Sequence, residues 1–135
     1  MQVRDGMSRM VLTVGPGHTL RQAAKLMADR KVGAAVVLDP DGPGHGIITE
    51  RDILLSLGGG QDPDTETVGT HLSSDLVFAA PDWSLETAAA EMVKGGFRHL
   101  IVTDGADIAG ILSVRDIVRC WTDDGATCEI PAVSA

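Results

Sequence analysis

Apolar residues follow two spacings along this chain, and their order predicts helices that alternate with strands. Leu20, Ala23 and Met27 keep the i, i+3, i+7 spacing of one helix face. Thr19 and Gln22 form a capping box at the start of this stretch, so we expect a helix over residues 19–30. Short apolar runs that end in turn residues predict strands. The expected strands and the second helix of this half cover residues 11–14, 34–38, 46–49 and 50–57.

The same pattern returns in the second half of the chain. A shift of 65 residues places Leu20 on Leu85, and a shift of 64 places Gly46 on Gly110. The repeated elements are expected at residues 76–79, 85–95, 99–103, 108–112 and 114–121. Each half therefore reads β-α-β-β-α, which predicts a mixed α/β (α+β) fold. We divide the chain into a first repeat with its N-terminal segment (residues 1–60), a linker (61–75) and a second repeat with a C-terminal tail (76–135).

A short motif passes from strand to helix in both halves. It combines a glycine, a hydroxyl residue, an arginine and an aspartate. A helix N-terminus offers unpaired N–H groups to an anion, and the aspartate can accept hydrogen bonds from a sugar diol. The alternative is a plain capping box, which explains the hydroxyl and the acid but not the arginine between them. The motif residues are Thr49, Arg51 and Asp52 in the first half and Ser113, Arg115 and Asp116 in the second.

On these residues the chain resembles a tandem pair of CBS domains, known as a Bateman module. The opening Val3–Ser8 and the helices that begin at Thr19 and Ser84 add to the likeness, which covers nearly the whole sequence. The resemblance implies two repeats packed as one pseudo-two-fold module that binds AMP, ADP, ATP or S-adenosylmethionine in clefts between them. It also implies a regulatory role, here in a chain similar to the stand-alone CBS-pair proteins.

The resemblance assigns roles to individual residues. Asp52 and Asp116 would hold ribose hydroxyls, and Thr49 and Ser113 would face phosphate together with nearby basic residues. Backbone near Val36 and Ile101 would border the base.

The two halves differ just before one strand. The second has Arg98 and His99 where the first has Gly33 and Ala34. We therefore expect unequal sites, with the one that depends on Arg98 and His99 the stronger and its affinity rising as pH falls, because a protonated histidine adds positive charge beside a phosphate.

Composition narrows the function classes. The 135 residues include no Tyr, two Phe and two Trp, and the net charge is −8, which disfavours a nucleic-acid partner or an anionic membrane surface. The four histidines lack metal-ligand spacing, and no nucleophile is paired with a base, so we expect no metal site, no required cofactor and no enzymatic activity.

The N-terminus does not resemble a secretory signal, which favours a cytoplasmic location. Cys120 and Cys128 are interpreted as free thiols, with a short-range disulfide left open.

Two function classes remain from the sequence. The first is a ligand-sensing module whose bound nucleotide regulates a protein partner that the sequence does not identify. The second is a structural dimerisation module without nucleotide. A homodimer is expected in either case, because the helices that begin at residues 50 and 114 carry more apolar residues than one small core needs. These residues are Ile53, Leu54, Leu57, Ile117, Val118 and Trp121.

Overall fold

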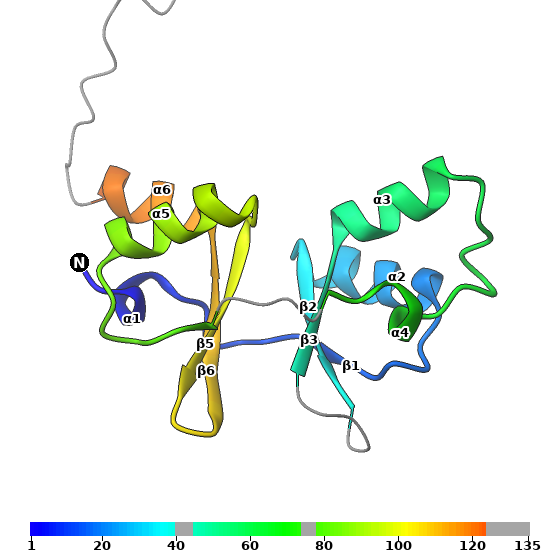
Figure 1. Cartoon of the computed structure of the whole chain (residues 1–135), viewed down its shortest axis with the longest axis horizontal. Helices are drawn as coiled ribbons and strands as arrows, with labels where there is room; N and C mark the ends of the chain where they lie inside the picture. Colours follow the sequence, from blue (N-terminus) through cyan, green and yellow to red (C-terminus); the bar gives the residue numbers. More distant parts are fainter. Residues whose placement is uncertain (40–44, 74–77, 124–135) are drawn as a thin grey trace, which may run out of the picture. The chain divides into compact units, whose positions relative to one another are not determined.

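The computed structural model describes residues 1–39, 45–73 and 78–123, and the chain divides into two compact units (Figure 1). The first-repeat unit comprises Met10–Leu76. The second-repeat unit comprises Met1–Arg9 together with Val77–Ala135. Each unit contains one three-stranded sheet with helices, which confirms the mixed α and β fold class. Residues 124–135, which include Cys128, and the first two residues of the strand expected over 76–79 lie outside the described residues.

The first-repeat unit has a mixed sheet in the order β1-β2-β3. Strand β1 is parallel to β2, and β3 is antiparallel to β2, with Ala34 paired to Thr49. Because β3 runs directly into α3, the chain turns from strand to helix at Thr49. The elements of this unit are β1 (Thr13–Val14), α2 (Leu20–Arg30), β2 (Ala34–Leu38), β3 (His45–Thr49), α3 (Glu50–Gly58) and α4 (Val68–His71).

The second-repeat unit has the same topology. Its sheet has the order β4-β5-β6, with β4 parallel to β5 and β6 antiparallel to β5. Strand β6 runs directly into α6, and His99 pairs with Ser113 at that end of the sheet. The elements are α1 (Val3–Gly6), β4 (Phe78–Ala79), α5 (Leu85–Gly95), β5 (His99–Asp104), β6 (Asp107–Ser113) and α6 (Val114–Asp123).

The two cores lie where the amphipathic patterns place them. In β2, Ala35 and Val37 belong to the core cluster that packs against the helices, so Val36 faces the opposite side of the sheet. The first cluster consists of Leu12, Val14, Leu20, Ala23, Met27, Ala35, Val37, Ile48, Ile53 and Val68. The second consists of Val3, Ala79, Leu85, Ala88, Met92, Leu100, Val102, Leu112, Ile117 and Cys120.

Each core is completed by a short helix, α1 in the second-repeat unit and α4 in the first-repeat unit. Val3 of α1 is fully buried in the second cluster, and Val68 of α4 is fully buried in the first. The two segments are equivalent, because a shift of 65 residues places Val3 on Val68 and Ser8 on Ser73. Residues 1–9 therefore pack within the second-repeat unit.

The segment after each short helix pairs with the last strand of its sheet. Ser8 bridges to Ile111 and Ser73 bridges to Ile47, both antiparallel. A Cβ atom at Gly110 would lie 2.6 Å from the carbonyl oxygen of Ser8, closer than real contacts allow. The motif glycine thus lets the paired segment approach the strand, and Gly46 does the same beside Leu72 in the first repeat.

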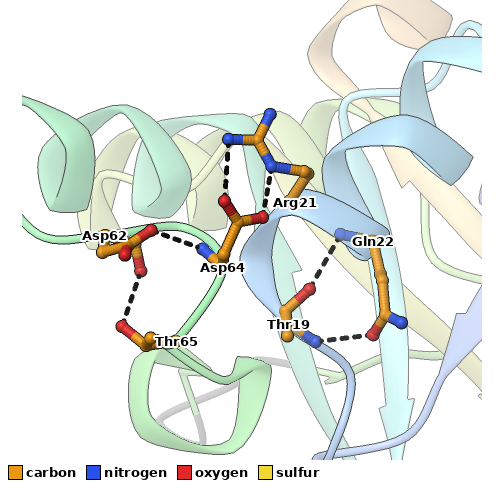
Figure 2. A network of polar contacts seen from close by, with 6 residues as sticks. All are labelled: Thr19, Arg21, Gln22, Asp62, Asp64 and Thr65. Carbon is orange, nitrogen blue, oxygen red and sulfur yellow. Dashed lines mark hydrogen bonds and ion pairs between the residues drawn. The ribbon is translucent and has the colours of Figure 1, made fainter.

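The stretch expected to be a linker is packed onto the first-repeat unit. The Leu20 amide donates to the Glu66 carbonyl at 2.9 Å, and the Arg21 guanidinium forms an ion pair with Asp64 on the surface (Figure 2). This pairing raises the pKa of Arg21, chiefly through the hydrogen bond to Asp64. Figure 2 also shows the capping box that the sequence predicts, in which Thr19 and Gln22 exchange two hydrogen bonds.

Candidate functional site

The motif of the first repeat is held by a capping box at the start of α3. The Thr49 hydroxyl accepts a hydrogen bond from the Asp52 amide at 3.3 Å. Asp52 Oδ2 accepts in return from the Thr49 amide at 2.8 Å and from the Thr49 hydroxyl at 2.9 Å. The two bonds to the carboxylate both end on the same oxygen, Oδ2. Within the described residues Asp52 Oδ1 has no hydrogen-bond or ion-pair partner, so it can accept a hydrogen bond from a ligand.

The motif of the second repeat has the same capping geometry. The Ser113 amide donates to Asp116 Oδ2 at 2.8 Å, and the Asp116 amide donates to the Ser113 hydroxyl at 3.1 Å. The other carboxylate oxygen, Oδ1, lies 3.4 Å from the guanidinium of Arg119. The two repeats thus orient their carboxylates alike but give them different neighbours.

Arg119 was not singled out by sequence reasoning. Its i, i+3 spacing from Asp116 is the one sequence signal that could have indicated this ion pair.

Backbone hydrogen bonds bring a second segment to each motif. The amide of Glu50 donates to the Gly33 carbonyl at 2.9 Å, and the amide of Val114 donates to the Arg98 carbonyl at 2.9 Å. Arg98 therefore lies at the N-terminus of α6, and the neighbouring His99 is paired with Ser113 across the sheet. The structure thus brings Arg98, His99 and Ser113 together within the second-repeat unit, on the same helix end as Asp116.

The motif arginines are exposed at the second position of their helices. Neither Arg51 nor Arg115 has a hydrogen-bond or ion-pair partner among the residues that the structure describes, and the Arg98 side chain is likewise exposed. No contact within these residues therefore gives the two motif arginines a structural role. A cation at a helix N-terminus is also unfavourable for the helix itself, because it lies beside the positive end of the dipole.

Val36 and Ile101 occupy equivalent places in the central strands of the two sheets. Val36 pairs with Thr13 and Ile47, and Ile101 pairs with Phe78 and Ile111. The Val36 amide donates to the Leu12 carbonyl at 2.9 Å, so the sheet itself uses this backbone group. The side chains of Val36 and Ile101 therefore lie on the sheet face opposite the helices.

The helices that follow the motifs have exposed apolar residues. Ile53 and Ile117 belong to the cores, so they do not contribute to a surface patch as the sequence suggested. Trp121 is partly buried against the second core. The exposed apolar residues of these helices are Leu54, Leu55 and Leu57 on α3 and Val114 and Val118 on α6.

The described residues also bear on metal binding and on membrane insertion. No group of three or more His, Cys, Asp or Glu side chains in residues 1–39, 45–73 and 78–123 could hold a metal ion. No described helix is both long enough and apolar enough to span a membrane. Cys120 is a free, buried cysteine of the second core.

Comparison with known proteins shows what the chain is similar to. The CBS domain family model matches residues 2–59 and 68–123. The CBS domain-containing protein YhcV of Bacillus subtilis is 36% identical over 116 residues, which cover 85% of this chain and 81% of that protein. The hexameric CBS-CP12 protein from bloom-forming cyanobacteria is 29% identical at a TM-score of 0.82, over 87% of this chain and 69% of that one. The CBS domain protein PAE2072 from Pyrobaculum aerophilum was solved in complex with AMP. It is 25% identical at a TM-score of 0.77, and the match covers 86% of this chain and 89% of that one.

Proposed function

We propose that this chain, which belongs to the CBS-domain family and carries a tandem pair of such domains, is a regulatory module that binds an adenosine-containing nucleotide. The observation that carries the proposal is the capped carboxylate at the start of α3 and of α6, with a second oxygen directed away from the cap. A ribose diol is the ligand group that such an acceptor fits. The AMP complex of the related PAE2072 supports the same ligand class.

The remaining motif groups suit the phosphate of such a ligand. The N-terminus of α3 or α6 presents the positive end of the helix dipole, beside Thr49 or Ser113. Arg51 and Arg115 follow two residues after Thr49 and Ser113, and neither has a side-chain partner in the described part of the chain. In this proposal, Val36 and Ile101 border the base. The module has no catalytic role and needs no cofactor; it alters how a protein partner is engaged when nucleotide is bound.

The second-repeat site is proposed to be the stronger of the two. Arg98 places a permanent positive charge at the N-terminus of α6, whereas the equivalent position in the first repeat is Gly33. A charge-assisted hydrogen bond to phosphate contributes about 1.5–3 kcal/mol, or roughly one to two orders of magnitude in affinity. Titration calorimetry on Arg98→Ala should therefore show nucleotide affinity reduced about tenfold or more. Unchanged nucleotide affinity in this variant would contradict the asymmetry.

Thermal melting tests the proposed ligand class. A ligand that binds only the folded state at one hundred times its Kd adds about 2.7 kcal/mol of stability, which raises Tm by roughly 10 °C in a domain of this size. The panel is AMP, ADP, ATP, S-adenosylmethionine and NAD. The double variant Asp52→Asn, Asp116→Asn keeps an oxygen acceptor for each cap and should abolish the shift. If none of the five ligands raises Tm, the nucleotide proposal is wrong.

The exposed leucines of α3 support a homodimer of the nucleotide-binding module. Leu54 and Leu55 are 67% and 63% exposed, although they lie beside the buried Ile53 on a nine-residue helix. We propose that this surface and Val118 of α6 pair in a homodimer, as apolar patches on soluble proteins commonly do. Light scattering should give twice the chain mass at micromolar concentration, and the monomer mass for Leu54→Glu. A monomeric wild-type protein would contradict the proposal.

A further inference from the structure

Arg119 links the carboxylate of the second-repeat motif to the N-terminal helix. Its Nη2 donates to the Gly6 carbonyl oxygen at 3.0 Å and lies 3.4 Å from Asp116 Oδ1. Gly6 is the last residue of α1, and Asp116 stands in the first turn of α6. One guanidinium therefore connects two elements that are far apart in the sequence.

The α1 end of this link is held firmly. The Val3 amide donates to the Trp83 carbonyl at 2.7 Å, and the Arg4 amide donates to the Pro81 carbonyl at 3.0 Å. Gly6 itself packs so closely on α6 that a Cβ atom there would lie 2.7 Å from the Sγ of Cys120. The Gly6 carbonyl is thus a fixed acceptor as long as α1 stays packed, and it restricts where the Arg119 side chain can point.

Among its described residues, the first repeat has no such link. The position equivalent to Arg119 is Leu55, whose side chain is exposed. No cation of the described residues forms an ion pair with Asp52. The two motifs share their capping geometry, so Arg119 is the clearest difference between the surroundings of the two carboxylates.

We propose that Arg119 couples nucleotide binding at Asp116 to the packing of α1. Packed α1 fixes Arg119, and Arg119 fixes the ligand-facing oxygen of Asp116 in the position that accepts a ribose hydroxyl. A carboxylate oxygen has room for both partners, so the ligand adds to the Arg119 contact and does not displace it. Because binding linkage is reciprocal, bound nucleotide in turn stabilises packed α1. Arg119 is a positioning residue here, and the coupling rests on the proposed function.

The solvent exposure of the Arg119–Asp116 pair sets the expected size of the coupling. The Arg119 side chain is 56% exposed and that of Asp116 is 19% exposed, so solvent screens the pair and its effect is small. We expect a two- to fivefold change in nucleotide affinity, which titration calorimetry can resolve. A larger change would indicate that the variant has lost the fold of the unit.

The experiment uses the full chain in an Asp52→Asn background, which leaves Asp116 as the only motif carboxylate. The probe is AMP. Arg119→Leu introduces the side-chain type of the first repeat, Arg119→Lys retains the charge, and Leu55→Ala is the matched control at the equivalent position. Titration calorimetry gives the Kd for each protein. Hydrogen exchange of residues 3–7, with and without AMP, reports the packing of α1.

The coupling predicts that AMP slows exchange in residues 3–7 of the background protein and that Arg119→Leu removes this effect. AMP affinity should fall two- to fivefold in Arg119→Leu, recover in part in Arg119→Lys and stay unchanged in Leu55→Ala. If Arg119→Leu binds AMP as the background protein does, or if AMP leaves exchange of residues 3–7 unchanged, the coupling is wrong while the nucleotide site stands. If AMP binds neither the background protein nor the unsubstituted chain, the coupling to AMP fails, and the nucleotide proposal fails with it only if none of the five ligands of the melting panel raises Tm.

Discussion

Truncating Val3 should loosen the second-repeat unit and leave the first-repeat unit intact. Val3 is fully buried in the cluster that contains Leu100 and Leu112, although it stands at the opposite end of the sequence. Val3→Ala removes two methyl groups, each contributing about 0.8 kcal/mol by transfer, and leaves a cavity that adds to the loss. We expect the second-repeat unit to lose about 2–3 kcal/mol of unfolding free energy.

Hydrogen exchange can assign this loss to one unit, because each unit has a buried central strand. A change of 2–3 kcal/mol corresponds to roughly 30- to 150-fold in the opening equilibrium, so amides of β5 should exchange faster by about that factor in Val3→Ala. Amides of β2 should exchange as in the unsubstituted protein. Val68→Ala is the matching control, because Val68 is fully buried in the first cluster. This variant should speed amide exchange in β2 and leave exchange in β5 unchanged.

The result that would refute this reasoning is equal acceleration of β2 and β5 in Val3→Ala. It would mean that the two units open together and that the division of the chain has no energetic meaning. Acceleration of β2 alone would mean that residues 1–9 stabilise the first repeat, as the sequence suggested.

Three further predictions use the same sites. Gly110→Ala should lower the free energy of unfolding by about 1–3 kcal/mol, because the added Cβ would press on the Ser8 carbonyl. Gly46→Ala should lower it less, because the closest contact there is the movable end of the Leu72 side chain. Chemical denaturation measures both losses, and the reverse order would contradict this reasoning. AMP affinity should fall in His99→Ala, because an imidazole N–H can donate to phosphate, and equal affinity by calorimetry would remove His99 from the proposed site. A phosphate-release assay with ATP should show no turnover, and turnover that Asp116→Asn abolishes would overturn the non-catalytic assignment.

Local patterns were sufficient to predict most of the elements. The α2 helix was expected over residues 19–30 and begins at Leu20 with Thr19 as its N-cap, because the capping box and the apolar face both lie within one short stretch. The β2 strand covers residues 34–38 as expected. Such features depend on neighbours three or four positions away, and single-sequence reasoning can recover them.

The features that sequence reasoning missed depend on distant partners. Residues 3–8 and 68–73 share only a valine and a serine at matching positions, so the equivalence of α1 and α4 was not recognised before the structure placed both valines in the cores. The bond from Arg119 to the Gly6 carbonyl spans 113 positions. Spacing rules apply to residues a few positions apart, so they cannot predict this bond. Arg119 is a charged surface residue, so the hydrophobic pattern does not indicate it either.

The structure also changes the choice between capping and ligand binding that the motif presented. At sequence level the two roles compete for the same aspartate, because either one accounts for a hydroxyl followed by an acid at the third position. In the structure the cap uses only Oδ2 of Asp52 and of Asp116. Two bonds from Thr49 restrict where Oδ1 of Asp52 points, and in Asp116 the Ser113 amide and the Arg119 guanidinium together restrict where Oδ1 points. A cap that orients an acceptor before the ligand arrives lowers the entropy cost of binding, so the capping box strengthens the case for a ligand site.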